Sequence, residues 1–166
     1  TTNPINSIFS LKVQFGIGTY ADPKLQQTAE LLNLLGTSEL SFNQFKGELQ
    51  KIGTTLDVRV DQDYFWISLK GFDNQFEESL TFLADFMTQV KGDDSKIKIL
   101  LNNAKAGRKM EVKEPSTVGR ALRDYVYYGE NSAYLNRMTV KEIKKSTSVD
   151  YLQSFTNAQQ YEADLF

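Results

Sequence analysis

Apolar and polar residues alternate between Ile8 and Phe15, in the first patterned segment of the chain. One face of this segment carries serine, lysine and glutamine, and the other carries Phe9, Leu11, Val13 and Phe15. Successive side chains of a β-strand point to opposite sides, so a period of two is typical of a strand with one buried face. The pattern therefore predicts a half-buried strand over residues 8–15.

A second alternating region predicts a β-hairpin. Apolar residues recur at every second position over residues 55–60 and again over residues 64–69, with the polar segment Asp61–Asp63 between them. Two such runs joined by a short polar segment are typical of paired antiparallel strands. Trp66 is out of phase with the apolar row of the second strand, so we expect its side chain on the opposite face of the sheet.

Helical periodicity dominates the remaining residues. Helix starts are indicated by Asp22 before Pro23, by Ser116, and by the capping-box pairs Ser41/Gln44 and Thr139/Glu142. Glycine marks several of the ends, as is common after the last turn of a helix. Together these signals predict helices over residues 23–35, 42–52, 76–90, 95–112 and 117–128, then two more after Thr139 and through Phe155. The tail Tyr161–Phe166 is expected to begin a strand.

The order of these elements indicates an α+β fold. A strand, two helices, a hairpin, several helices and a terminal strand are typical of an antiparallel or mixed β-sheet with helices packed on one face. The chain has 166 residues and shows no internal repeat or linker, so we expect one domain over residues 1–166.

The absence of histidine and cysteine restricts the chemistry most. The chain has 0 His and 0 Cys, which removes the commonest general base and the usual zinc ligands together. Its 19 basic and 21 acidic residues give a net charge of −2, without the basic stripe of a nucleic-acid binder. No apolar run approaches the roughly 20 residues that cross a membrane. We therefore expect no catalytic residue, metal site or cofactor in this chain, and neither nucleic acid nor membrane as a partner.

Two short motifs suggest ligand sites but lack parts that those sites require. Gly16–Gly18 has neither the third glycine of a dinucleotide fingerprint nor the Gly-Lys-Ser/Thr end of a phosphate loop. Asp57, Asp61 and Asp63 lack the turn glycine and the bidentate glutamate of a calcium loop. A strand exit and a solvated turn explain both motifs.

An aromatic and basic cluster lies in the second half of the chain. Its members are Arg120, Arg123, Tyr125, Tyr127, Tyr128, Tyr134 and Arg137. Tyrosine and arginine are enriched at protein interfaces, so the cluster is a candidate contact surface. The competing interpretation is that half of the cluster forms the buried face of a helix.

Five segments resemble, in their order and spacing, the pitrilysin/insulinase (inverzincin) family of zinc metallopeptidases. They are Phe15–Thr19, Leu34–Thr37, Leu49–Thr54, Tyr128–Tyr134 and Met138–Ile143, so the resemblance extends over nearly the whole chain. It implies the LuxS/pitrilysin-like metallopeptidase fold. It also implies further strands before Thr1 and after Phe166, so we expect a fragment of a longer multidomain peptidase, truncated at both ends.

In catalytic relatives the first helix carries an inverted zinc motif, H-x-x-E-H, shortly before a Gly-Thr pair. Counting back from Gly36 places Gln27 and Leu31 at the two histidine positions and Glu30 at the acid position. The family's distal glutamate ligand would fall near Asn103–Lys109, a segment that holds no acidic residue. The resemblance therefore implies a degenerate motif and no zinc in this chain.

The family commonly joins a catalytic half to a degenerate half of the same fold, and the two enclose a chamber for peptides. The resemblance implies that this chain is a non-catalytic domain of the C-terminal half, with zinc bound in the catalytic half of the same polypeptide. The alternative is a stand-alone scaffold or interaction module on the same fold. The compartment stays open, with a bacterial periplasmic or exported parent protein as the expectation.

In catalytic halves of the family, the strand after the second helix pairs with extended substrate. The matching segment here is Gly53–Leu56, and we hypothesise that it has become a passive part of the chamber wall. A proline at Thr55 is expected to remove one backbone donor from this edge. Open strand edges also recruit strands of other molecules, so edge-to-edge self-association is expected.

Overall fold

The first strand, β1 (Ile8–Phe15), forms where the alternation predicts it and lies inside an antiparallel sheet. The structure is a computed structural model that describes residues 7–166. Within them the strand order is β2-β3-β1-β4, with β2 at Thr55–Val60, β3 at Phe65–Phe72 and β4 at Ala163–Leu165. Every neighbouring pair is antiparallel, which confirms the hairpin and the terminal strand and removes the mixed sheet.

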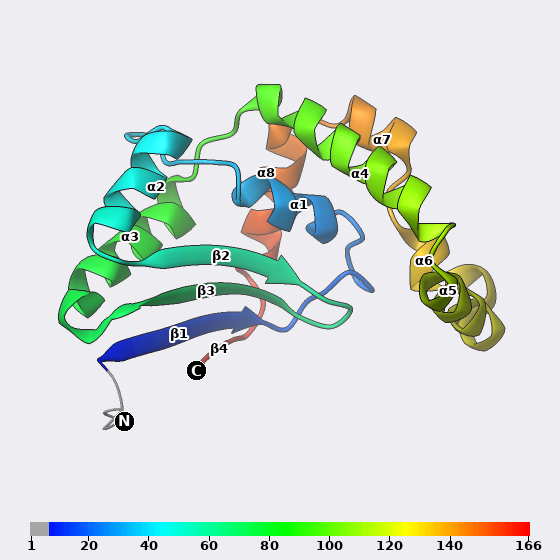
Figure 1. Cartoon of the computed structure of the whole chain (residues 1–166), viewed down its shortest axis with the longest axis horizontal. Helices are drawn as coiled ribbons and strands as arrows, with labels where there is room; N and C mark the ends of the chain where they lie inside the picture. The colour runs from blue at the N-terminus through cyan, green and yellow to red at the C-terminus, as the bar shows by residue number, and fades with distance from the viewer. Residues whose placement is uncertain (1–6) are drawn as a thin grey trace.

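Helices cover one face of this sheet, as Figure 1 shows, which confirms the predicted α+β class. The α-helices are α1 (Leu25–Leu32), α2 (Phe42–Lys51), α3 (Phe76–Gln89), α4 (Ile97–Glu111), α5 (Pro115–Tyr128), α6 (Ala133–Asn136), α7 (Val140–Lys145) and α8 (Ser148–Ala158). Short 3₁₀ turns are η1 (Asp73–Gln75), η2 (Asp94–Lys96) and η3 (Gly129–Asn131). In Figure 1, α5 and α6 lie at the end of the molecule farthest from α2 and α3.

The core lies between the sheet and the helices that cover it. The strand register aligns Val13 with Ile67, and Ile67 with Val58, so apolar residues form rows across three strands. From the helix side, Phe155 of α8 meets Phe65 with ring centroids 5.9 Å apart. Each such side chain contributes about 1.5–3 kcal/mol when it is fully buried. Trp66 lies on the opposite face as predicted, where the Lys12 ammonium sits 4.6 Å from its ring.

Helix α1 is shorter than the sequence predicts at both ends. Asp22 accepts a hydrogen bond from the Lys24 backbone but starts a turn, and the regular helix begins at Leu25. The helix ends at Leu32 rather than Leu35, because Asn33 points its amide at strand β2. A side chain that bonds backbone elsewhere competes with continuation of the helix, so this boundary depends on a contact far away in sequence.

The helix that was expected to start after Ser116 begins two residues earlier. Pro115 occupies its first turn and Glu114 is the cap residue. Proline suits this position because its missing N–H would have no partner inside the helix. The capping box of Thr139 and Glu142 forms as predicted at the start of α7.

Candidate functional site

A cavity of about 470 Å³ lies between α1, α4 and the segment that holds α6. Helix α1 contributes Gln26, Gln27 and Glu30, and helices α1 and α4 contact one another. The other lining residues are Thr19, Pro23, Asn103, Ala104, Gly107, Arg108, Glu111, Ala133, Arg137 and Met138. Two of the three degenerate-motif positions therefore face the segment that the sequence matched to the distal metal ligand.

The third motif position does not reach this cavity. Leu31 is 0% exposed and belongs to the apolar core, whereas Gln27 is 9% exposed and lines the cavity. The side-chain amide oxygen of Gln27, Oε1, is buried without a hydrogen-bond partner among the described residues. Glu30 is half-buried and accepts a hydrogen bond of 3.1 Å from the Gln26 amide.

Two arginines join α4 to the segment after α5. Arg137 donates to both carboxylate oxygens of Glu111, at 2.8 and 2.7 Å, and stacks on the Tyr134 ring at 4.0 Å. Arg108 donates to the backbone carbonyl of Met138. Both bonds to Glu111 come from one nitrogen, Nη1 of Arg137, and hydrogen bonds between two charged groups are shorter and stronger than neutral ones. Arg137 and Tyr134, which the sequence grouped with a contact surface, are thus engaged within the chain.

The rest of that aromatic and basic cluster lies on α5, and no residue of α5 is buried. The expectation that half of the cluster forms a buried helix face is therefore wrong. Tyr127 is 75% exposed and Val126 is 80% exposed, and Arg120 and Arg123 are exposed as well. The sequence could not separate the two interpretations, since an amphipathic helix has the same pattern whether its partner is in the chain or outside it.

An apolar groove of about 330 Å³ runs between α5 and α6. Its walls include Val118, Leu122 and Leu135, and the hydroxyl of Ser132 is buried beside it without a partner in residues 7–166. Exposed apolar surface that is contiguous marks contact sites on soluble proteins. Helix α5 is therefore the strongest candidate for an interface in the described residues.

Strand β2 is an outer strand of the sheet, but bonds within the chain already occupy part of its edge. The N–H of Val58 donates to Asn33 at 3.0 Å, and its carbonyl accepts from the same amide at 2.7 Å. The ammonium of Lys46 donates to the carbonyl of Leu56 at 3.0 Å. Burial lowers the pKa of Lys46, and the nearby carboxylate of Asp57 opposes that shift.

The direction of the Val58 backbone groups also determines where the backbone groups of its neighbours in β2 point. Alternate residues of an antiparallel strand direct their backbone N–H and C=O groups to opposite edges of the strand. The backbone groups of Leu56 and Val58 therefore point to the open edge, and those of Thr55 point to β3. Thr55 pairs with Lys70 of β3 in the register. The expectation that a proline at Thr55 would remove a donor from the open edge is therefore wrong, since that N–H belongs to the ladder inside the sheet.

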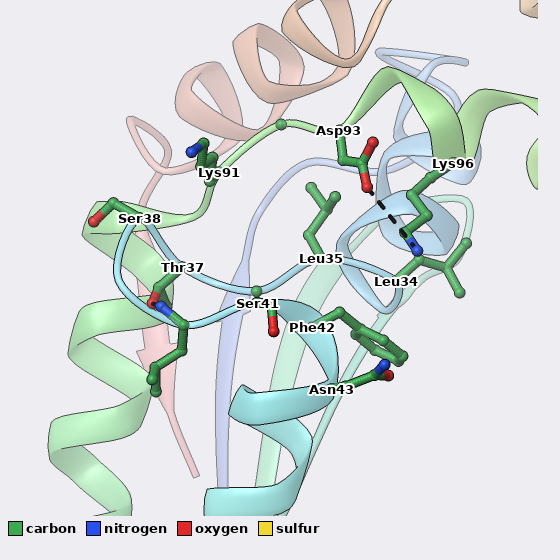
Figure 2. A pocket seen from close by; sticks show the side chains of 13 residues that line it. Leu34, Leu35, Thr37, Ser38, Ser41, Phe42, Asn43, Lys91, Asp93 and Lys96 are labelled. Carbon is green, nitrogen blue, oxygen red and sulfur yellow. Dashed lines mark hydrogen bonds and ion pairs between the residues drawn. The ribbon is translucent and has the colours of Figure 1, made fainter.

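A second pocket, of about 510 Å³, lies beside the start of α2 (Figure 2). The Lys96 ammonium lies 4.0 Å from the Asp93 carboxylate and 5.8 Å from the Phe42 ring, and Asp93 accepts from the Ser95 backbone at 2.9 Å. A hydrogen bond from Ser95 lowers the pKa of Asp93. Asp93 and Lys96, which Figure 2 joins with a dashed line, thus neutralise one another. Among the described residues that line this pocket, every buried side-chain polar atom has a hydrogen-bond partner.

A family profile described as Insulinase (Peptidase family M16) matches residues 2–139. The chain belongs to the M16 peptidase family. No curated protein sequence shows a significant match. Peptidases of the M16 family depend on zinc, and within residues 7–166 no group of three or more His, Cys, Asp or Glu side chains could hold a metal ion.

Solved structures with the same fold include two proteases. The periplasmic protease PqqL from Escherichia coli matches with a TM-score of 0.82 and 14% identity over 99% of this chain and 19% of its own. The ferredoxin protease FusC, solved as a mutant in complex with Arabidopsis ferredoxin, matches with a TM-score of 0.77 and 13% identity over 96% and 18%. This M16 chain thus spans about a fifth of those two chains.

A domain described as inactive shares the fold as well. The inactive M16 peptidase domain from Pseudomonas fluorescens matches with a TM-score of 0.76 and 18% identity, over 91% of this chain and 38% of that one. At sequence identities this low, the structural similarity establishes the shared fold and nothing further. No helix in residues 7–166 of this M16 chain is long and apolar enough to cross a membrane.

The residues of the α1 cavity do not fit a catalytic zinc ion. Such an ion takes three protein ligands, usually histidine with a carboxylate. The carboxylates that line the cavity are Glu30 and Glu111, and Glu111 is held by Arg137. At the two positions that the resemblance assigns to histidine, Gln27 offers an amide and Leu31 a buried aliphatic side chain, and neither is a usual zinc ligand.

Proposed function

We propose that this M16 chain is a non-catalytic domain and forms part of the wall of a peptidase chamber. Its substrates are peptides, and the zinc that cleaves them is bound by a catalytic half of the same polypeptide. The observation that carries this proposal is that Gln27 and Leu31, which the family resemblance places at the two histidine positions of the zinc motif, are not zinc ligands. The chain itself then spans one domain, residues 1–166, of a longer peptidase.

The exposed helix α5 supports a contact with another domain. Its apolar side chains project from the body of the chain, and a stand-alone protein would leave this surface in water. The same surface also suits the alternative function, a scaffold module, so α5 alone does not decide between the two. The inactive domain from Pseudomonas fluorescens supports the interpretation that M16 folds persist without catalysis.

Strand β2 supports a passive role for the segment Gly53–Leu56. Peptide addition to a sheet draws its affinity from unpaired main-chain groups. At this edge Asn33 bonds both main-chain groups of Val58, and Lys46 bonds the carbonyl of Leu56. We therefore assign no substrate strand to β2.

The test is peptide cleavage by the complete polypeptide that contains this domain, with single changes on α5. Val126→Asp places a charge in the exposed apolar surface and should reduce turnover at least about tenfold while zinc content stays the same. Val149→Asp is the matched control, because Val149 of α8 is 69% exposed against 80% for Val126. If Val126→Asp leaves turnover unchanged, the proposal that this domain contacts the rest of the peptidase through α5 is contradicted.

A further inference from the structure

The α1 cavity holds one carboxylate whose charge has no basic partner. Four ion pairs form in the described part of the chain, and none of them includes Glu30. Of the other lining charges, Glu111 binds Arg137 in an ion pair, and Arg108 donates to the neutral Met138 carbonyl. Glu30 is therefore the lining carboxylate that a cationic ligand would meet.

A second acceptor lies one helical turn away on the same face of α1. Residues three apart on a helix are neighbours, so Gln27 and Glu30 lie side by side. The amide oxygen of Gln27 is buried without a partner in residues 7–166, although its side chain lines the cavity. The terminal torsion of glutamine is broad, so this oxygen can turn toward a donor that enters the cavity.

We propose that this cavity binds a primary alkylammonium group, from a lysine side chain or from the amino terminus of a peptide. An ammonium carries three donors and one positive charge, which match the carboxylate of Glu30 and the amide oxygen of Gln27. A metal ion would find too few ligands, and an anion would meet the carboxylate of Glu30. Amine binding does not depend on the proposed function, because it concerns this chain alone.

Two amines separate the sources of the ammonium. The ¹⁵N-labelled chain of residues 1–166 is titrated at pH 6.5 with n-butylammonium chloride, which represents lysine, and with alaninamide hydrochloride, which represents a peptide amino terminus. Saturable shifts of backbone resonances in α1 and α4 are expected for at least one of them. N-acetylalaninamide and sodium propionate, which lack the ammonium, should give no saturable shift there.

Substitutions identify the acceptors. Glu30→Gln should weaken amine binding at least about tenfold, because it removes the charge from the hydrogen bond while keeping its shape. Gln27→Leu should weaken it as well, and Glu39→Gln, on an exposed loop, should leave it unchanged. The proposal is overturned if neither amine saturates, if propionate binds equally well, or if Glu30→Gln retains full affinity.

Discussion

The side chain of Asn33 takes the place of a neighbouring strand at the edge of β2. It bonds both backbone groups of Val58 and also donates to the carbonyl of Ala29 at 3.1 Å. No local pattern could predict this role, since Asn33 and Val58 are 25 residues apart. The sequence correctly placed a helix before Asn33 and a strand around Val58, but it misplaced the helix end that this contact determines.

Replacing Asn33 with alanine tests that role. Asn33→Ala leaves a half-buried strand edge without its partners, so the free energy of unfolding should fall by about 1–3 kcal/mol. Asn102→Ala, at an exposed position of α4, is the control and should change stability by less than about 0.5 kcal/mol. Urea denaturation of both variants measures the difference. Equal stability of the two would mean that the bonds to Val58 contribute nothing.

At the scale of elements, period and capping predicted most of the fold. The alternation gave β1 and the hairpin, and the capping boxes of Ser41 and Thr139 gave the starts of α2 and α7. Such signals involve residues within one turn or one strand, so they are present in the sequence itself. The direction of each backbone group and the exposure of α5 depend on neighbours distant in the chain, and sequence reasoning missed both.

The orientation of β2 leads to a prediction about Thr55. Since its N–H points to β3, Thr55→Pro breaks the ladder and should destabilise the chain by roughly 2–3 kcal/mol. Thr55→Val keeps the N–H and should be tolerated within about 0.5 kcal/mol. Thermal unfolding of the two variants distinguishes these outcomes. A stable proline variant would show that Thr55 faces outward after all.

At the scale of the whole molecule, the lack of histidine determines how stability depends on pH. Among the described residues, carboxylates near helix starts that accept backbone N–H bonds include Asp94 from Ser148, Glu142 from Thr139 and Asp150 from Thr147. In each case this backbone hydrogen bond is the main cause that lowers the pKa of the carboxyl group. A carboxyl group whose pKa is lower in the folded state stabilises the fold at pH values above its pKa in the unfolded chain. This stabilisation is lost as the pH falls through the pKa of the folded state.

The free energy of unfolding should therefore be flat between about pH 6 and 8, where a protein with histidine would titrate. The free energy of unfolding should fall as the pH drops below about 4, first through the ordinary pKa range of carboxyl groups and then through the lowered pKa values of these three. Urea denaturation at a series of pH values checks both parts. A change between pH 6 and 8 as large as the change below pH 4 would contradict the assignment.

The central claim is that this M16 chain holds no catalytic zinc, and metal analysis tests it most directly. The chain of residues 1–166 is purified with zinc present, dialysed, and measured by mass spectrometry together with cleavage of a fluorogenic peptide. We expect zinc far below one ion per chain and no cleavage, because the family resemblance places Gln27 and Leu31, which are not zinc ligands, at the positions of the two histidine ligands. Near-stoichiometric zinc that a chelator removes together with peptidase activity would contradict it.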